Sequence, residues 1–350
     1  MEHHLRRPPL PSSEPADRSA PRQATPRLAD VARLAGVSTA TVSRVLSNPE
    51  VVTVETRQRV EEAIRATGYR LNHAARNLRH RRTGGVVALV PDLSNPFFSQ
   101  ILAGMSAVLA PASYNLLIAD TRAMSAESIL GYAEPSRADG LIVLDGAVPL
   151  ERYEPRIPLV LACEWIPGLT APRVKIDNRA AAALAVDHLV ALGHRHIGHV
   201  AGPPENVLTQ ARLAGTEQAL KAHGLPAPLV LPGDFSLDSG RRAGAAWLAL
   251  PEAERPRAMT FSSDAMACGF IGEVQHRGLA VPRDVSVMGF DDIELVAHMT
   301  PALSTIRQPR EAIGRRAAQL LLDLIAGTDT AEDVILPVEL VLRASTAAPG

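Results

Sequence analysis

The chain has 350 residues, which is long enough for a small domain and a larger two-lobed one, because domains usually contain about 100 to 200 residues. Its formal net charge is −1 and it has no run of about 18 apolar residues, so we expect no membrane span. The two cysteines, Cys163 and Cys268, lie in apolar segments. They indicate buried thiols in a reducing cytoplasm and exclude a disulfide scaffold.

The small net charge hides an uneven distribution. Residues 27–82 contain eleven arginines and five acidic residues, a formal charge of +6, whereas the chain after residue 82 has a formal charge of −8. A cationic segment on an acidic body is typical of a module that binds nucleic-acid phosphates. Residues 1–26 contain six prolines and no apolar core. We expect them to form a disordered arm and not a secretory signal, with the protein in the cytoplasm beside the nucleoid.

The segment LADVARLAGVSTATVSRVL, residues 28–46, predicts two short helices joined by a tight turn. The first helix should end at Gly36, and the second should begin after Ser38, a good N-cap. The inner stripe predicted for the first helix is Val31, Leu34 and Ala35. Small, hydroxylated or cationic residues remain on the outer face of the second helix, which suits the DNA major groove. The candidate DNA contacts are Ser38, Thr39, Thr41, Ser43 and Arg44.

An ordinary solvated helical hairpin would fit that segment alone, but the following residues favour DNA binding. Thr53 is the expected cap of a third helix that ends at Gly68. The next segment, residues 69–83, reads YRLNHAARNLRHRRT. With VSTATVSRVL and TRQRVEEAIRATGY, it resembles the LacI/GalR family of bacterial transcription regulators, and the resemblance extends over about residues 27–346. Later segments, VPDLSNPFFS, GFDDIEL and STIRQPREAIGRRAAQLLLD, are most similar to the cytidine-repressor branch.

After residue 84, short apolar runs alternate with amphipathic helices, which indicates parallel sheets covered by helices on both faces. The predicted strands are 86–90, 115–120, 140–144, 158–162, 196–202, 258–263 and 285–290. The resemblance implies an all-α helix-turn-helix head with a hinge helix, joined to a two-lobed α/β effector domain like that of periplasmic binding proteins. The implied domains are an arm (1–26), a DNA-binding domain (27–71), a hinge helix and linker (72–84), and an effector-binding and dimerisation domain (85–350). Its two lobes are expected at about 85–178 plus 309–337 and about 179–308 plus 338–346.

By resemblance, the hinge becomes a helix only when two copies lie side by side on DNA. Leu78 would then be a wedge that enters the minor groove and bends the site. A leucine among several arginines has no obvious core to join in the monomer. Phosphates or groove edges would be contacted by Tyr69, Arg76, Asn77 and Arg79.

The resemblance places an effector in the cleft between the lobes. Phe97 and Phe98 begin a helix and would stack on the ligand, although either could be a core residue. Arg212 would hold ligand oxygens in a bidentate fork, and Asp291 would accept hydrogen bonds from ligand hydroxyls. Further candidates at strand ends are Glu164, Asp177, Phe235, Ser263 and Asp264. Of these, Asp177 and Asp264 could equally be structural acids between the lobes.

Carboxylates, one arginine and aromatic rings together suit a neutral polyhydroxylated ligand, either a nucleoside or a sugar. The cytidine-repressor resemblance favours the nucleoside. The chain departs from that branch at Cys163-Glu164, where relatives have Asn-Glu, and it looks shortened at about residues 125–138 and 147–156. We expect no metal or other cofactor. His194 and His196 would share one face of a strand and His199 the other, which does not suit a common ligand set.

These observations predict a sequence-specific DNA-binding repressor that binds palindromic operator DNA as a homodimer. Its operator affinity would be coupled to effector binding, by either release or promotion, as relatives show both. A solute-binding protein of a transport system would share the body but would need no residues 27–82. An enzyme is disfavoured, because the sequence has no G-x-S-x-G, H-E-x-x-H or phosphate-binding loop.

Overall fold

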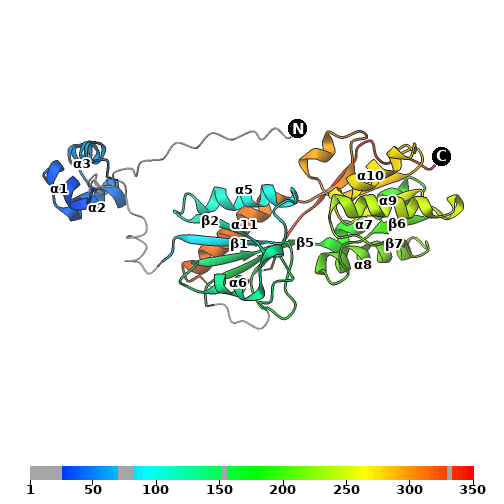
Figure 1. Cartoon of the computed structure of the whole chain (residues 1–350), viewed down its shortest axis with the longest axis horizontal. Helices are drawn as coiled ribbons and strands as arrows, with labels where there is room; N and C mark the ends of the chain where they lie inside the picture. Colours follow the sequence, from blue (N-terminus) through cyan, green and yellow to red (C-terminus); the bar gives the residue numbers. More distant parts are fainter. Residues whose placement is uncertain (1–25, 70–81, 151–155, 329–332) are drawn as a thin grey trace, which may run out of the picture. The chain divides into compact units, whose positions relative to one another are not determined.

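A computed structural model describes residues 26–69, 82–150, 156–328 and 333–350 (Figure 1). Internal contacts divide the chain into two compact units, residues 1–76 and 77–350, which we call the head and the body.

The head consists of three helices and a short 3₁₀ turn. These are α1 (Leu28–Ala35), α2 (Thr39–Ser47), η1 (Pro49–Val51) and α3 (Val54–Thr67). The predicted N-caps are confirmed, since Ser38 accepts a hydrogen bond from the Thr41 backbone and Thr53 accepts one from Thr56. The predicted ends of α1 and α3 are also confirmed: Gly36 adopts a φ of 67° and Gly68 a φ of 65°.

The core of the head corrects one detail of the predicted stripe. Leu34 is 58% exposed, and Ala32 is buried in its place between Val31 and Ala35. The face of α1 that packs against α2 and α3 is therefore rotated toward Ala32, whose small side chain allows a close approach. The other buried members of this core are Val42, Val45, Val60 and Ala63.

The body contains two six-stranded sheets, one in each lobe. The near lobe has the strand order β11-β5-β4-β3-β1-β2, and every pairing in it is parallel. The far lobe has the order β12-β10-β9-β8-β6-β7, and only the β10–β12 pair is antiparallel. The near-lobe strands are β1 (Gly85–Val90), β2 (Asn115–Asp120), β3 (Gly140–Val143), β4 (Leu159–Ala162), β5 (Arg173–Ile176) and β11 (Asp333–Leu336). The far-lobe strands are β6 (Ile197–Val200), β7 (Leu229–Leu231), β8 (Ala258–Phe261), β9 (Ser286–Asp291), β10 (Ser304–Arg307) and β12 (Glu339–Val341).

Helices cover both sheets (Figure 1). The near lobe has α5 (Phe97–Leu109), the short α6 (Ala126–Leu130) and α11 (Arg310–Ile325). The far lobe has α7 (Asn178–Ala191), α8 (Val207–Ala222), α9 (Leu237–Ala249) and α10 (Asp264–His276). Glycines bring α5 and α11 together, because a side chain at Gly104 or Gly314 would collide with the backbone of the facing helix. All seven predicted strands are present. The sequence analysis named no strand at β5, β7, β10, β11 or β12, each of which has only three or four residues.

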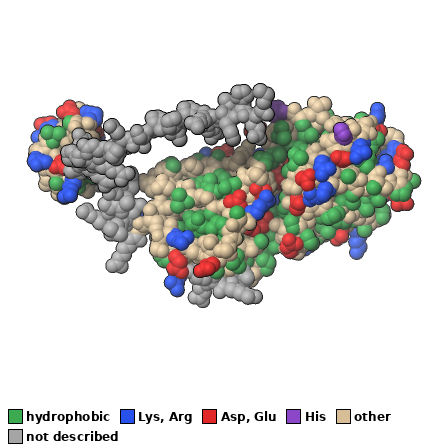
Figure 2. Space-filling view, viewed as in Figure 1, with side chains coloured by type: hydrophobic (Ala, Val, Ile, Leu, Met, Phe, Trp, Pro, Cys, Tyr) green, Lys and Arg blue, Asp and Glu red, His purple; other side chains and the backbone are tan. Residues whose placement is uncertain are grey.

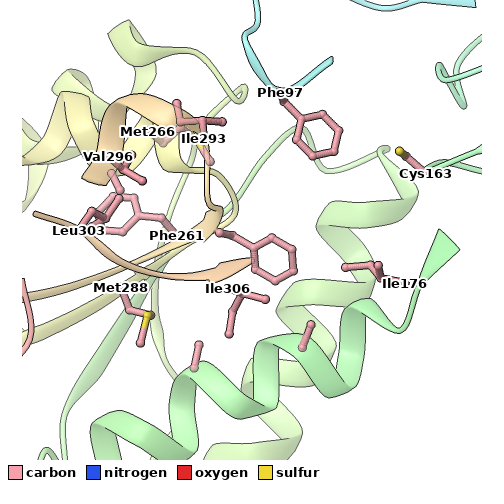
Figure 3. Close-up of a cluster of buried hydrophobic side chains, with 14 of the residues drawn as sticks. Phe97, Cys163, Ile176, Phe261, Met266, Met288, Ile293, Val296, Leu303 and Ile306 are labelled. Atoms are coloured by element: carbon pink, nitrogen blue, oxygen red, sulfur yellow. The ribbon is translucent and has the colours of Figure 1, made fainter. Parts of the chain in front are cut away.

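The chain crosses between the lobes three times, after β5, after β10 and after β11. A buried apolar cluster continues across this junction (Figure 3). It combines Phe97, Cys163 and Ile176 with far-lobe residues such as Phe261 and Ile306. The crossings and this cluster hold the two lobes together, so that the carboxyl ends of strands from both sheets surround one cleft.

Candidate functional site

The outer face of α2 carries the candidate DNA contacts of the head. Ser38, Thr39, Ser43 and Arg44 are exposed, and Thr41 is half-buried with its hydroxyl 2.9 Å from that of Ser38. No large apolar side chain of the described residues lies among them on this face, so the helix can approach a polar groove. Tyr69, in contrast, is half-buried and packs on the head core. The hinge candidates Arg76, Asn77, Leu78 and Arg79 lie outside the described residues and stay predictions.

The body contains a cavity of about 210 Å³ between its lobes, which we call the cleft cavity. Its near-lobe wall includes residues that follow β1, β3 and β4, and its far-lobe wall includes residues at the ends of β8 and β9. Ligands of open parallel sheets bind at the carboxyl ends of the strands, where the cleft cavity lies. Seven of the predicted effector contacts line it: Phe97, Phe98, Glu164, Arg212, Phe235, Ser263 and Asp291.

Arg212 is the buried cation of the cleft cavity. Its Nε donates to Asn178 Oδ1 at 2.9 Å, and its Nη1 donates to the Ser262 carbonyl at 2.5 Å. The guanidinium carbon lies 3.8 Å from the centre of the Phe290 ring. These contacts hold the planar group in one orientation, as a rigid fork requires.

Asp291 is the counter-charge, with its Oδ1 4.0 Å from Arg212 Nη1. Gln308 Nε2 donates to the same carboxylate at 2.8 Å. Burial raises the pKa of Asp291 to about 6, although the nearby arginine opposes that rise. At neutral pH the carboxylate is therefore mainly ionised and can accept hydrogen bonds from ligand hydroxyls.

Glu164 connects the two lobes across the cleft cavity. Its Oε2 accepts from the Gly146 backbone at 2.7 Å, in the near lobe, and its Oε1 accepts from Asn206 Nδ2 at 3.0 Å, in the far lobe. Burial raises the pKa of Glu164, and the bond from Asn206 opposes that rise. A ligand in the cavity would therefore compete with or extend a contact that already joins the lobes.

Backbone strain is concentrated around the cleft cavity. Cys163, Phe235 and Asp291 have φ values of 68°, 65° and 121°, and all three line the cavity. Only two other described non-glycine residues have positive φ, Ser113 and Asp292. Such conformations cost free energy in residues with a Cβ and are commonly found at ligand sites.

Two predicted contacts lie outside the cleft cavity. Asp177 caps α7, where it accepts hydrogen bonds from the backbones of Arg179 and Ala180. Asp264 is fully buried and accepts from Thr305 Oγ1 at 2.6 Å and from the Ile293 backbone at 2.9 Å. Burial raises the pKa of Asp264 well above its usual value. Both side chains make structural contacts, but the partners of Asp264 lie within the far lobe, so its contacts do not join the two lobes.

Several polar residues line the cleft cavity that the sequence analysis did not single out: Asp92, Arg122, Asp145, Asn206 and Asp234. Asp92, Arg122 and Asp145 each lie two residues after a strand, β1, β2 and β3, so their position at a strand end was a usable signal. Asn206 caps α8 and Asp234 lies in a loop, where the sequence pattern carries no such signal.

The three histidines of residues 194–199 do not share a site. The strand begins only at Ile197, so the prediction that His194 and His196 share a strand face is wrong. His194 is buried with its Nε2 2.9 Å from the Ala347 carbonyl, and His196 is exposed. His199 lies between the hydroxyls of Thr260 and Ser262, and burial lowers its pKa to about 4. Within the described residues, no group of three or more potential ligands could hold a metal ion.

Charged side chains of both signs are mixed over the visible face of the body (Figure 2). Among the helices that the structure describes, none is both long and apolar enough to cross a membrane.

Comparisons with known proteins match both units. Residues 27–72 match the lacI family of bacterial regulatory proteins, and residues 186–346 match a periplasmic binding protein-like domain. The chain is 38% identical over 328 residues to the HTH-type transcriptional repressor CytR of Escherichia coli (strain K12), covering 91% of this chain and 96% of that protein. It is 34% identical to the HTH-type transcriptional repressor PurR of Aliivibrio fischeri (strain ATCC 700601 / ES114), with coverages of 90% and 97%.

Solved structures agree with this assignment. The lac repressor dimer bound to operator and the anti-inducer ONPF has a TM-score of 0.81 at 30% identity, covering 92% of this chain and 99% of that one. The complex of the transcriptional regulator CelR with cellobiose has a TM-score of 0.69 at 33% identity, with coverages of 91% and 99%. The chain therefore belongs to the lacI family of bacterial regulatory proteins and is a DNA-binding transcription regulator, not an enzyme.

Proposed function

We propose that this regulator is a repressor that binds palindromic operator DNA as a homodimer, and that a small polyhydroxylated effector in the cleft cavity controls its operator affinity. The observation that carries this proposal is the composition of the cavity wall. A buried arginine–aspartate pair of the far lobe faces an aromatic pair of the near lobe, Phe97 and Phe98, whose ring centres are 5.1 Å apart. Two relatives, CytR and PurR, are named repressors, and a structural neighbour is a dimer bound to its operator.

The chemistry of the wall suits hydroxyl groups on one side of the ligand and an apolar ring face on the other. Carboxylate oxygens of Asp291 and Glu164 can accept from vicinal hydroxyls, and Arg212 can donate to a ligand oxygen. The rings of Phe97, Phe98 and Phe235 can cover a sugar face or a base. A sugar is supported by the cellobiose complex of CelR, and a nucleoside by the resemblance to the cytidine-repressor branch.

Control of DNA binding follows from linkage. An effector that contacts both walls of the cleft cavity binds one arrangement of the lobes better than another, and this difference in affinity is the coupling free energy. In the head, Ser38, Thr39, Thr41, Ser43 and Arg44 would contact the operator, and Tyr69 with the hinge residues Arg76, Asn77, Leu78 and Arg79 would complete the interface. A protein that acts on operator DNA works in the cytoplasm.

The test combines DNA binding and ligand binding on the full-length protein. A gel shift with DNA from upstream of its own gene should give a specific complex, and a thermal-shift screen of nucleosides and sugars should identify a ligand that raises Tm. The same ligand should then change the gel shift. A ligand that raises Tm but leaves the gel shift unchanged would contradict the proposed control of operator affinity.

A further inference from the structure

The cleft cavity has an excess of acidic side chains. Five carboxylates line it, and the described lining residues include only two cations, Arg122 and Arg212. The acids are Asp92, Asp145, Glu164, Asp234 and Asp291. Asp234 is also paired with Arg242, a residue that does not line the cavity, so Asp145 and Glu164 are the lining carboxylates without an arginine partner among the described ion pairs. A phosphate ester carries about −1.5 to −2 charges at neutral pH, so this wall repels it.

Both arginines are already matched with acids. Arg122 is the exposed one, with 64% of its side chain accessible, and its Nη2 forms an ion pair with Asp92 Oδ2 at 2.7 Å. Arg212 is buried, and its charge is balanced by Asp291 while Asn178 and Ser262 occupy two of its nitrogens. A phosphate would have to break one of these pairs and leave a carboxylate unmatched.

Helix N-termini are the other common phosphate sites, because their free backbone N–H groups and the helix dipole attract anions. Four helices begin at the cleft cavity, namely α5, α8, α9 and α10. In the first turn of each, at least one backbone N–H already donates a hydrogen bond to a side-chain oxygen of this chain. An acidic residue, Asp238, also lies in the first turn of α9, where it reduces the attraction for an anion. The oxygens come from Asn95, Asn206, Ser236 and Ser263.

We infer that the cleft cavity selects an unphosphorylated ligand, and that Asp92 enforces this selection by neutralising Arg122. This inference rests on the proposed function and specifies its ligand class: a free nucleoside or sugar, and not its phosphate. Phosphorylation of the ligand by another protein would therefore end the signal that this regulator reads.

The first experiment compares matched ligand pairs on the full-length protein. Ribonucleosides are titrated beside their 5′-monophosphates, and pentoses beside their 5-phosphates, by isothermal titration calorimetry, starting from the compounds that raise Tm. We expect each monophosphate to bind at least about tenfold more weakly than its parent. A monophosphate that binds as tightly as its parent overturns the inference but leaves the proposed function standing. If neither class binds, the proposed effector class fails, and this inference fails with it.

The second experiment tests the role of Asp92. In the Asp92→Asn variant Arg122 loses its ion-pair partner. The ratio of the affinity for the parent ligand to that for its monophosphate should therefore decrease by about tenfold, mainly through tighter binding of the monophosphate. Asp187→Asn is the matched control, because Asp187 is an exposed carboxylate paired with His223 and does not line the cavity. An unchanged ratio in Asp92→Asn would show that Asp92 does not enforce the selection.

Discussion

In the head, the candidate DNA contacts of α2 lie within seven consecutive residues, from Ser38 to Arg44, on one face of one helix. In the body, the cleft cavity is lined by residues spread from Pro91 to Asp291, on two sheets and at the starts of several helices. The first surface depends on local helix geometry, whereas the second exists only when both lobes are folded and adjacent. Substitutions in the two units should therefore separate DNA recognition from effector response.

The largest expected effect is that of Arg212→Ala on effector binding. The substitution removes the buried cation and leaves Asp291 without its counter-charge. Loss of one partner of a buried ion pair typically lowers the free energy of unfolding by about 3–5 kcal/mol. We expect calorimetry to show loss of effector binding, while the gel shift without effector stays near that of the wild type. Arg283→Ala is the control, since Arg283 is an exposed far-lobe arginine paired with Asp284. If Arg212→Ala binds effector as tightly as the wild type does, Arg212 is not an effector contact.

Leu78→Ala tests the connection between the two units. By resemblance, a wedge at this position must offset the unstacking of bases, about a few kcal/mol per step, and truncation removes the wedge but keeps every arginine. Specific operator binding should weaken strongly and DNA bending should decrease. Non-specific binding and its salt dependence should barely change, because they report neutralised phosphates. Circular-permutation gel shifts measure the bend, and wild-type bending by the variant would contradict the hinge prediction.

Arg44→Ala should alter the base preference of the head for its operator and leave effector binding by the body unchanged. Arg44 is exposed on the outer face of α2, and loss of one base contact typically costs about 1–3 kcal/mol per half-site. The expected change is a relaxed preference at one symmetric pair of operator positions, measured by gel shifts with single-base operator variants. A uniform loss of affinity across all variants would instead make Arg44 a phosphate contact.

The contrast between the units also explains what the sequence could predict. Ser38, Thr53, Gly36 and Gly68 act on backbone within a few residues, so helix ends in the head followed from local pattern. Leu34 did not follow, because its exposure depends on which side of α1 meets α3.

In the body, seven of the twelve described strands could be predicted from the sequence, but the direction of individual side chains could not. Asp264 follows a strand near the cleft cavity, yet it is held in the interior by Thr305, 41 residues later in the chain. Asn206 and Asp234 reach the cavity from loops, and their position depends on how the two lobes meet. Such long-range pairings leave no local pattern, and here the family resemblance carried the prediction of the seven lining residues.

The smallest expected effect is a pH dependence of effector affinity. Burial raises the pKa of Asp291 to about 6. The carboxylate is therefore mainly ionised more than about one pH unit above this value and mainly protonated more than about one unit below it. Protonation removes acceptor capacity toward ligand hydroxyls and weakens the pairing with Arg212. Affinity should therefore be full above pH 7 and fall by up to about tenfold per unit below pH 6. Protonation of Glu164, whose pKa is also raised, would act in the same direction.

Stability should change in the opposite direction over the same range. Because the folded-state pKa of Asp291 lies above its unfolded value, its contribution to stability is greatest at low pH and decreases as the pH rises toward 6. Calorimetric titrations with effector between pH 5 and 8 measure the affinity, and unfolding experiments over the same range measure the stability. The Asp291→Asn variant should bind effector weakly at every pH, without the change near pH 6. An affinity that is constant from pH 5 to 8 in the wild type would show that an ionised Asp291 does not accept hydrogen bonds from the effector.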